Sequence, residues 1–187
     1  MGFRQAAVLA ACCFFLGVLS VCFTVDYRVL FAPLGDETVR DGLEFYTTFF
    51  HSPPAIKALL HAVMGVGIIG LIGKVHKWDE SAMYFDGSSL ASFVFAIVVY
   101  ISVGIPASRT IATPVPDVDT REDQIEALRI LSAANVIMAV CLGAVLTLQA
   151  GETYARHIET KELAKAAEAE AKANANTEEK VESKKDQ

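Results

Sequence analysis

Four long apolar stretches that almost lack charged side chains constrain the fold of this chain more than any other feature. No Asp, Glu, Lys or Arg occurs in residues 5–25, 87–108 or 130–151. A helix needs roughly 20 apolar residues to cross the hydrocarbon core of a bilayer, and each of these intervals is long enough. The sequence therefore predicts that the chain crosses a membrane more than once.

The fourth stretch, residues 56–75, contains Lys57 and Lys74 near its ends and His61 one turn inside. Long lysine side chains at the ends of a span extend toward the headgroups, so we expect both ammonium groups at the membrane surface. Together the stretches predict an all-α polytopic membrane protein with a four-helix transmembrane bundle, whose spans lie at about 6–25, 56–75, 88–107 and 130–150.

Neither a soluble domain nor a cleaved signal peptide accounts for these stretches as well as membrane spans do. A soluble all-α domain with 53% hydrophobic residues would have too little polar surface to stay dispersed. A cleaved signal peptide has a shorter apolar region, of about 7 to 15 residues, and an A-x-A-like cleavage site, which is not found before Asp26. We therefore expect the first stretch to remain as a membrane span.

The distribution of Lys and Arg predicts the orientation of the chain. If the N-terminus faces the cytoplasm, ten of the 16 basic residues lie on the cytoplasmic side, most of them after residue 155. Cytoplasmic segments of membrane proteins carry an excess of Lys and Arg. Both chain ends are therefore expected in the cytoplasm.

The composition changes abruptly after Tyr154. Residues 1–155 are expected to form the four-span membrane domain, and residues 156–187 a hydrophilic cytoplasmic tail rich in Ala, Glu, Lys and Asn. Such a tail cannot form a core, so we expect a helix that continues the fourth span, frays near Asn174 and leaves the tail partly disordered. Lys184 and Lys185, followed by two final residues, match a dilysine signal for retrieval to the endoplasmic reticulum.

The connection between the first two spans is long and aromatic. Val39, Leu43, Tyr46 and Phe50 recur at helical spacing, which predicts a short amphipathic helix on the lumenal side, ended by Ser52-Pro53-Pro54. An interfacial belt of aromatic side chains on a loosely ordered loop is an equally open interpretation.

Turn-forming and capping residues mark the ends of the last two spans. The run from Asp86 to Ser89 is expected to form a turn and to start the third span, which should end at Gly104–Pro106. Thr120 and Asp123 have the spacing of a capping box, so the fourth helix should begin before the membrane.

Small residues on the second span predict a helix contact. Its glycines lack side chains and therefore let another helix approach closely; they are Gly65, Gly67, Gly70 and Gly73. The partner is either one of the chain's own spans or a client protein. Asn135 and His61 are further candidate contact residues, because polar groups inside a membrane bond to neighbouring helices.

No pattern in the sequence indicates an enzyme. The cysteines lie within predicted spans, the histidines fall in separate regions, and we find no metal-binding, phosphate-binding or paired-carboxylate motif. No cluster of polar groups is expected in the membrane, and no catalytic residue, cofactor, metal ion or nucleic acid partner is predicted. His61 is expected near the interface, hydrogen-bonded to a neighbouring helix.

Three segments resemble a known family: Asp26-Tyr27 with Leu30-Phe31, the run from Gly67 to Lys74, and the segment from Ser132 to Ile137. Up to Tyr154 the chain is similar to the fungal endoplasmic reticulum membrane chaperones that package amino-acid permeases. The resemblance implies a four-span domain that keeps newly made permeases from aggregating. It also implies a cytoplasmic tail that helps to bring them to COPII vesicle coats. Amino-acid permeases, COPII coat components and membrane lipid are the implied partners.

Two functions follow from these observations. The first is a non-enzymatic chaperone of the endoplasmic reticulum membrane that assists the folding of amino-acid permeases and their packaging into COPII vesicles. The alternative is a small four-span transporter or a structural membrane protein of the secretory pathway.

Overall fold

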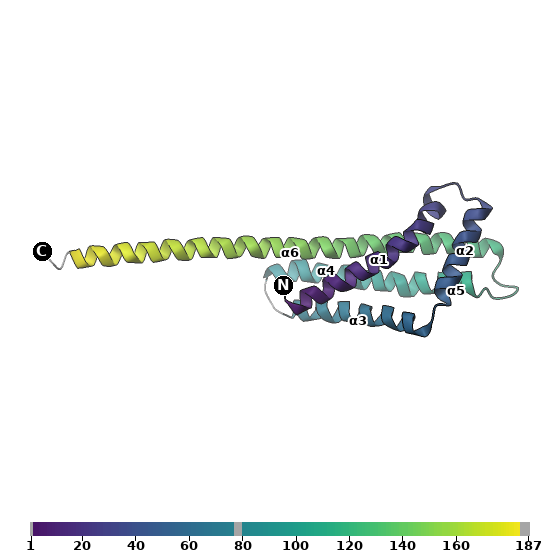
Figure 1. Ribbon diagram of the computed structural model, residues 1–187, viewed down its shortest axis with the longest axis horizontal. Coiled ribbons are helices and arrows are strands. Elements are labelled where there is room, and N and C mark those ends of the chain that lie inside the picture. The colour runs from purple at the N-terminus through teal and green to yellow at the C-terminus, as the bar shows by residue number, and fades with distance from the viewer. Residues whose placement is uncertain (1, 77–79, 184–187) are drawn as a thin grey trace. The chain divides into compact units, whose positions relative to one another are not determined.

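The structure is a computed structural model that describes the backbone of residues 2–76 and 80–183. Every regular element in these ranges is helical. In chain order the elements are α1 (Phe3–Phe31), α2 (Asp36–Phe50), α3 (Pro54–Val75), α4 (Glu80–Val99), a π-helical turn η1 (Tyr100–Gly104), α5 (Ile105–Ala112) and α6 (Arg121–Ser183) (Figure 1).

Helices of membrane-spanning length dominate the fold. Within the described residues, four are long and apolar enough to cross a bilayer: Phe3–Phe31, Pro54–Val75, Met83–Ala112 and Arg121–Glu170. This confirms the prediction of an all-α polytopic membrane protein. Three of these helices extend well beyond the predicted spans, because they continue into polar sequence at their ends.

Contacts along the chain define two units, residues 1–149 and 150–187. The second unit is the C-terminal part of α6 and is mostly exposed where its side chains are described. Within it, Lys165 Nζ lies 3.0 Å from Glu162 Oε1, and pairs of this kind stabilise a helix by roughly 0.2–0.5 kcal/mol. The helix continues to Ser183, past Asn174, where fraying was expected. Lys184 and Lys185 lie outside the described residues.

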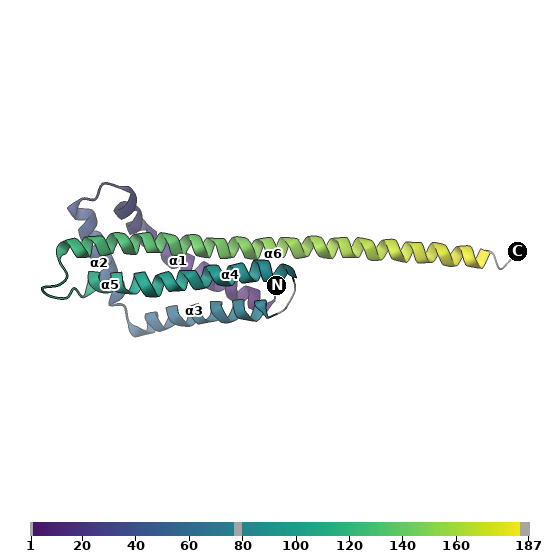
Figure 2. The same ribbon diagram turned by 180° about the vertical axis from the view of Figure 1, so that it is seen from behind.

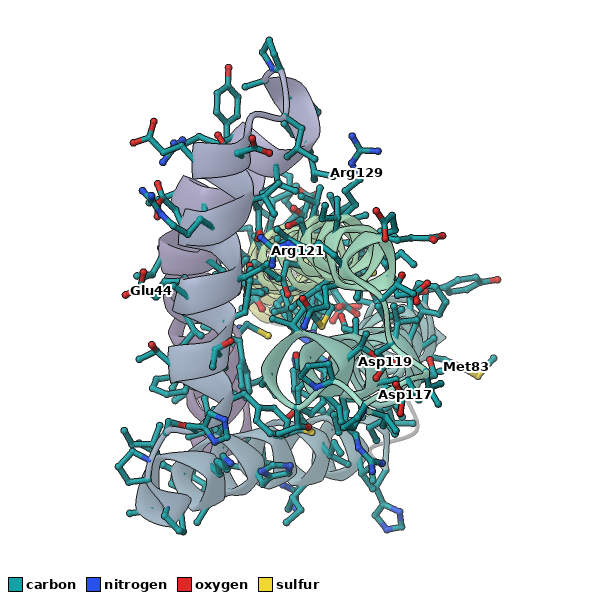
Figure 3. All side chains as sticks on the ribbon, turned by 90° about the vertical axis from the view of Figure 1, so that its right-hand side faces the viewer. Glu44, Met83, Asp117, Asp119, Arg121 and Arg129 are labelled. Atoms are coloured by element: carbon teal, nitrogen blue, oxygen red, sulfur yellow. The ribbon has the colours of Figure 1, made fainter. Side chains whose placement is uncertain are left out.

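The first unit is a bundle in which α1, α3, the α4–α5 segment and the first part of α6 lie side by side (Figures 1 and 2). The short helix α2 lies at the end of the bundle where α1 ends and α3 begins; we call this the α2 end. Exposed charged side chains surround it, among them Glu44 on α2 and Arg121 and Arg129 on α6 (Figure 3). Charges avoid the hydrocarbon core, so the α2 end lies at a membrane surface.

Helix α2 packs its apolar face onto the bundle. Val39, Leu43 and Tyr46 are buried, and they join a core cluster that includes Leu128 of α6 and Ile111 of α5. The approach is close, since a Cβ on Gly42 would lie 2.9 Å from Leu128 Cδ2. A helix is therefore present where the sequence left open a loosely ordered loop. Its lumenal location stays a prediction.

The ends of the third membrane helix differ from the predicted ones. Helix α4 begins at Glu80, so the run from Asp86 to Ser89 lies inside a helix and forms no turn. The helix also does not stop at Gly104–Pro106, but passes through the π-helical turn η1 and continues to Ala112. Proline is tolerated in membrane helices because a local π adjustment satisfies the backbone groups that it leaves free.

The start of α6 matches its predicted capping box. The backbone N–H of Thr120 donates to Asp123 Oδ2 over 2.8 Å, and the N–H of Asp123 donates to Thr120 Oγ1 over 3.2 Å. These reciprocal bonds satisfy free donors at the helix start. Helix α6 therefore begins at Arg121, ahead of its long apolar stretch.

Candidate functional site

A buried polar cluster joins three helices near the α2 end. It consists of Asp26 on α1, Tyr46 on α2 and Asn135 on α6, and we call it the tyrosine cluster. The Tyr46 hydroxyl donates to Asp26 Oδ1. Asn135 Nδ2 donates to Asp26 Oδ2 over 3.0 Å and to the Tyr46 oxygen over 2.8 Å. The cluster therefore links α2 to α1 and to α6.

The tyrosine cluster holds a carboxyl group without a basic partner. Asp26 is 0% exposed, and in the described part of the chain no Lys, Arg or His pairs with it. Burial and the nearby Asp26 carboxylate raise the pKa of Tyr46, so its hydroxyl stays protonated and donates at neutral pH. Losing one of these donors would leave a buried acceptor poorly satisfied, which costs about 1–3 kcal/mol.

A second buried polar cluster lies at the opposite end of the bundle. It consists of Lys74 on α3, Asp86 and Ser89 on α4, and Gln149 on α6, and we call it the lysine cluster. Lys74 Nζ lies 2.8 Å from Asp86 Oδ1 and also donates to Gln149 Oε1. Gln149 Nε2 in turn donates to Asp86 Oδ1 over 3.0 Å and to Ser89 Oγ over 3.1 Å. Three membrane helices meet at this charge pair.

These clusters overturn two expectations. The sequence indicated no convergence of polar groups in the membrane domain, and it placed the Lys74 ammonium among the headgroups. Lys74 instead turns inward, with a side chain 11% exposed, because Asp86 and Gln149 offer it acceptors. Positions far apart in the sequence become partners only when the helices are packed, and single-helix patterns do not contain that information.

The glycines of α3 divide into two groups. A Cβ on Gly67 would lie 2.6 Å from Phe93 Cζ, and one on Gly70 would lie 2.9 Å from Val8 Cγ2 and 3.3 Å from the Arg4 carbonyl oxygen. Gly73 is packed against Arg4, whose guanidinium donates to the Gly73 carbonyl. A Cβ on Gly65 would meet no atom of another described helix within 4 Å. Gly67, Gly70 and Gly73 thus serve the internal packing of α3, chiefly against α1, whereas Gly65 makes no such contact.

His61 is exposed on α3, and the expectation that it bonds to a neighbouring helix is wrong. Its Nδ1 lies 2.7 Å from the carbonyl oxygen of Lys57, in its own helix, where we expected a bond to a neighbouring helix. Its ring faces Tyr100, with the two centroids 6.1 Å apart. The contact with the next membrane helix is therefore aromatic. With Nδ1 donating to the carbonyl, Nε2 is available as an acceptor.

An apolar cavity of about 120 Å³ lies between these helices. It is partly open and is lined by residues of all the membrane helices and of α2, including Leu19, Met64, Ala96, Tyr100 and Asn135. No pattern in the sequence indicates this cavity, because the cavity depends on how the helices diverge. In the residues that the structure describes, no group of three or more His, Cys, Asp or Glu side chains could hold a metal ion.

The fold and these features define a polytopic helical membrane protein, with four membrane-length helices in the part of the chain that the structure describes and buried polar clusters toward both ends of the bundle. A model of the SHR3 chaperone family, described as ER membrane protein SH3, matches residues 1–187. The chain therefore belongs to this family of endoplasmic reticulum membrane chaperones, as the resemblance of its motifs predicted. It is a multi-pass protein of that membrane. Searches of curated proteins and of solved structures gave no match.

Proposed function

We propose that this protein is a non-enzymatic chaperone that shields the membrane helices of newly made amino-acid permeases and assists their packaging into COPII vesicles. The observation that carries the proposal is the family match, which spans the whole chain. A bundle of membrane helices is suited to clients that are themselves embedded in the bilayer.

The physical basis of the proposal is exchange of weak contacts between membrane helices. A partly inserted permease exposes small and polar helix faces that are meant for its own missing helices. Interhelical hydrogen bonds in membranes average about 0.6 kcal/mol and reach about 1.7 kcal/mol, so a chaperone that covers these faces can also release them. Ser20 and Thr24 on α1 are exposed, and the hydroxyl of each donates to a carbonyl of its own helix.

The polar side chains of the membrane helices bond within the protein itself. Asn135 is buried, and the Ser92 hydroxyl donates to the Cys141 carbonyl over 3.0 Å. Ser102 is exposed, but its hydroxyl donates to the Val98 carbonyl of its own helix over 2.7 Å. Clients therefore contact the exposed faces of the membrane helices and the cavity. Asn135, Gly67 and Gly70 maintain the arrangement of the helices.

Both termini are placed in the cytoplasm by this proposal. The tail then presents its charged helix to coat components, and Lys184 and Lys185 return escaped protein to the endoplasmic reticulum. The preference for this orientation comes from the excess of Lys and Arg in the tail.

The test is to delete the gene and to follow several tagged amino-acid permeases together with unrelated membrane cargo. We expect permeases to be retained in the endoplasmic reticulum while other cargo leaves normally. Retention of all cargo alike, or normal export of every permease, would contradict the proposal. A small transporter, the alternative favoured by the buried Lys74–Asp86 pair, would instead give altered solute flux with normal permease export.

A further inference from the structure

The cavity is formed where the membrane helices diverge. The first turns of α1 are packed against the last turns of α3 at Gly67 and Gly70. Toward the α2 end the two helices separate, as Figures 1 and 2 both show. The first two turns of α3 are exposed apart from Leu60, which lines the cavity. The tyrosine cluster holds α1, α2 and α6 together at this end, and it includes no residue of α3.

The size of the cavity restricts what can occupy it. Its volume is about 120 Å³. An apolar cavity of roughly 150 Å³ in another protein binds one benzene molecule, so this space fits a single ring. A whole lipid acyl chain is much larger. The lining residues with the highest exposure, Phe49 and His61, place the opening beside α2 and α3.

The cavity wall retains unused hydrogen-bonding capacity. Asn135 is 7% exposed, and both of its bonds in the described structure are made by Nδ2, which leaves its carbonyl oxygen without a partner there. The Tyr100 hydroxyl likewise makes no hydrogen bond within the described residues. Burying such groups without partners is unfavourable, so an occupant that carries a donor gains more than a purely apolar one.

We propose that this cavity binds one aromatic side chain with a hydrogen-bond donor, best a tyrosine, projecting from a membrane helix of a client permease. The ring fills the apolar space among α1, α3, α4 and α6, and its hydroxyl bonds to Asn135 or Tyr100. The client helix lies outside, along the exposed start of α3. This inference rests on the proposed chaperone function and names the part of the bundle that carries it.

Site-specific photo-crosslinking of the full chain in native microsomes tests the proposal. A methionine-sized diazirine residue replaces Met64 or Met138, which line the cavity, or Met83, which is 65% exposed on α4 and serves as the matched control. With a newly synthesised permease present, we expect crosslinks to the permease from Met64 and Met138 at least several-fold above those from Met83. Products containing lipid rather than permease at Met64 and Met138 would overturn the inference.

A further probe at Ile69, which is 72% exposed on α3, separates this inference from the function on which it rests. Permease crosslinks from Ile69 or Met83 without any from Met64 and Met138 would overturn the cavity as a binding site and leave the chaperone function standing. Absence of permease crosslinks from all four positions would contradict the chaperone function itself.

A substitution that fills the cavity provides an independent test. Ala96 lines the cavity and is 6% exposed, whereas Ala91 is exposed on the same helix. We expect Ala96→Leu to lower the amount of permease recovered with the protein several-fold, and Ala91→Leu to leave it unchanged. Equal recovery with both variants would overturn the inference. If Ala96→Leu fails to accumulate, the crosslinking result at Met64 and Met138 decides.

Discussion

Lys74 Nζ lies 2.8 Å from Asp86 Oδ1, and this ion pair joins the end of α3 to the beginning of α4 inside the bundle. The Asp86 side chain is only 1% exposed, so the ammonium group and Gln149 provide most of the stabilisation that water would otherwise give to the carboxylate. A buried pair of this kind contributes less to net stability than its removal costs, because a single change leaves one charge uncompensated.

We expect Lys74→Met to destabilise the bundle by about 3–5 kcal/mol, since Asp86 would stay buried without its ion-pair partner. Lys57→Met on the same helix is the control, because Lys57 is exposed and its ammonium group lies over the Phe50 ring, 5.1 Å from the centroid. Thermal unfolding of the detergent-solubilised protein measures both variants. Equal midpoints for the two would show that the pair is not a major constraint.

Tyr46→Phe should loosen α2 from the bundle. The change removes the hydroxyl that donates to Asp26, and leaving that buried acceptor poorly satisfied costs about 1–3 kcal/mol. Tyr27→Phe is the matched control, because Tyr27 is 55% exposed on α1. Limited proteolysis should cleave the α2 region faster in Tyr46→Phe alone. Identical rates in both variants would mean that packing holds α2 without the tyrosine cluster.

Gly70→Leu should separate α1 from α3, because its side chain would meet Val8 and the Arg4 backbone; overpacking of this kind costs about 1–3 kcal/mol or more. Gly65→Leu should be tolerated, since nothing lies within 4 Å of a Cβ there. An engineered cysteine pair between α1 and α3 reports their distance through its rate of oxidation. Slow oxidation in both variants, or in neither, would contradict the assignment of the two glycines.

Replacing Lys184 and Lys185 by alanine should let the protein reach the Golgi, because a retrieval receptor would no longer recognise its end. Replacing Lys161 and Lys165 removes the same charge within the tail helix and should leave localisation unchanged. Fluorescence microscopy with a Golgi marker distinguishes the two. Unchanged localisation of both variants would show that the dilysine is incidental.

The sequence predicted the membrane helices because their signal is local: a long run without charge needs no neighbour to be recognised. The periodic spacing of Val39, Leu43 and Tyr46 indicated α2, with a loosely ordered loop as an equally open alternative. The pair Thr120 and Asp123 predicted the start of α6. The ends of α4 were missed because they depend on tertiary contacts. Asp86 resembles a turn residue until Lys74 and Gln149 provide it with partners.

The candidate site was only partly accessible from the sequence. Asn135 and the four glycines of α3 were identified as candidate contact residues, and the structure places Asn135, Gly67, Gly70 and Gly73 in internal packing. Asp26 belongs to a segment that resembles the family. Nothing in the sequence, however, indicated its hydrogen bonds with Tyr46 and with Asn135, which lies more than 100 residues later in α6. The cavity follows from the divergence of α1 and α3, which is a property of the packed bundle.

The assembly state of a newly made amino-acid permease, in endoplasmic reticulum membranes with and without this protein, tests the central claim most directly. Mild detergent extraction followed by native electrophoresis measures it. We expect discrete permease species when the protein is present and large aggregates when it is absent, with unrelated polytopic proteins unaffected. The same distribution of permease species in both membranes would contradict the account.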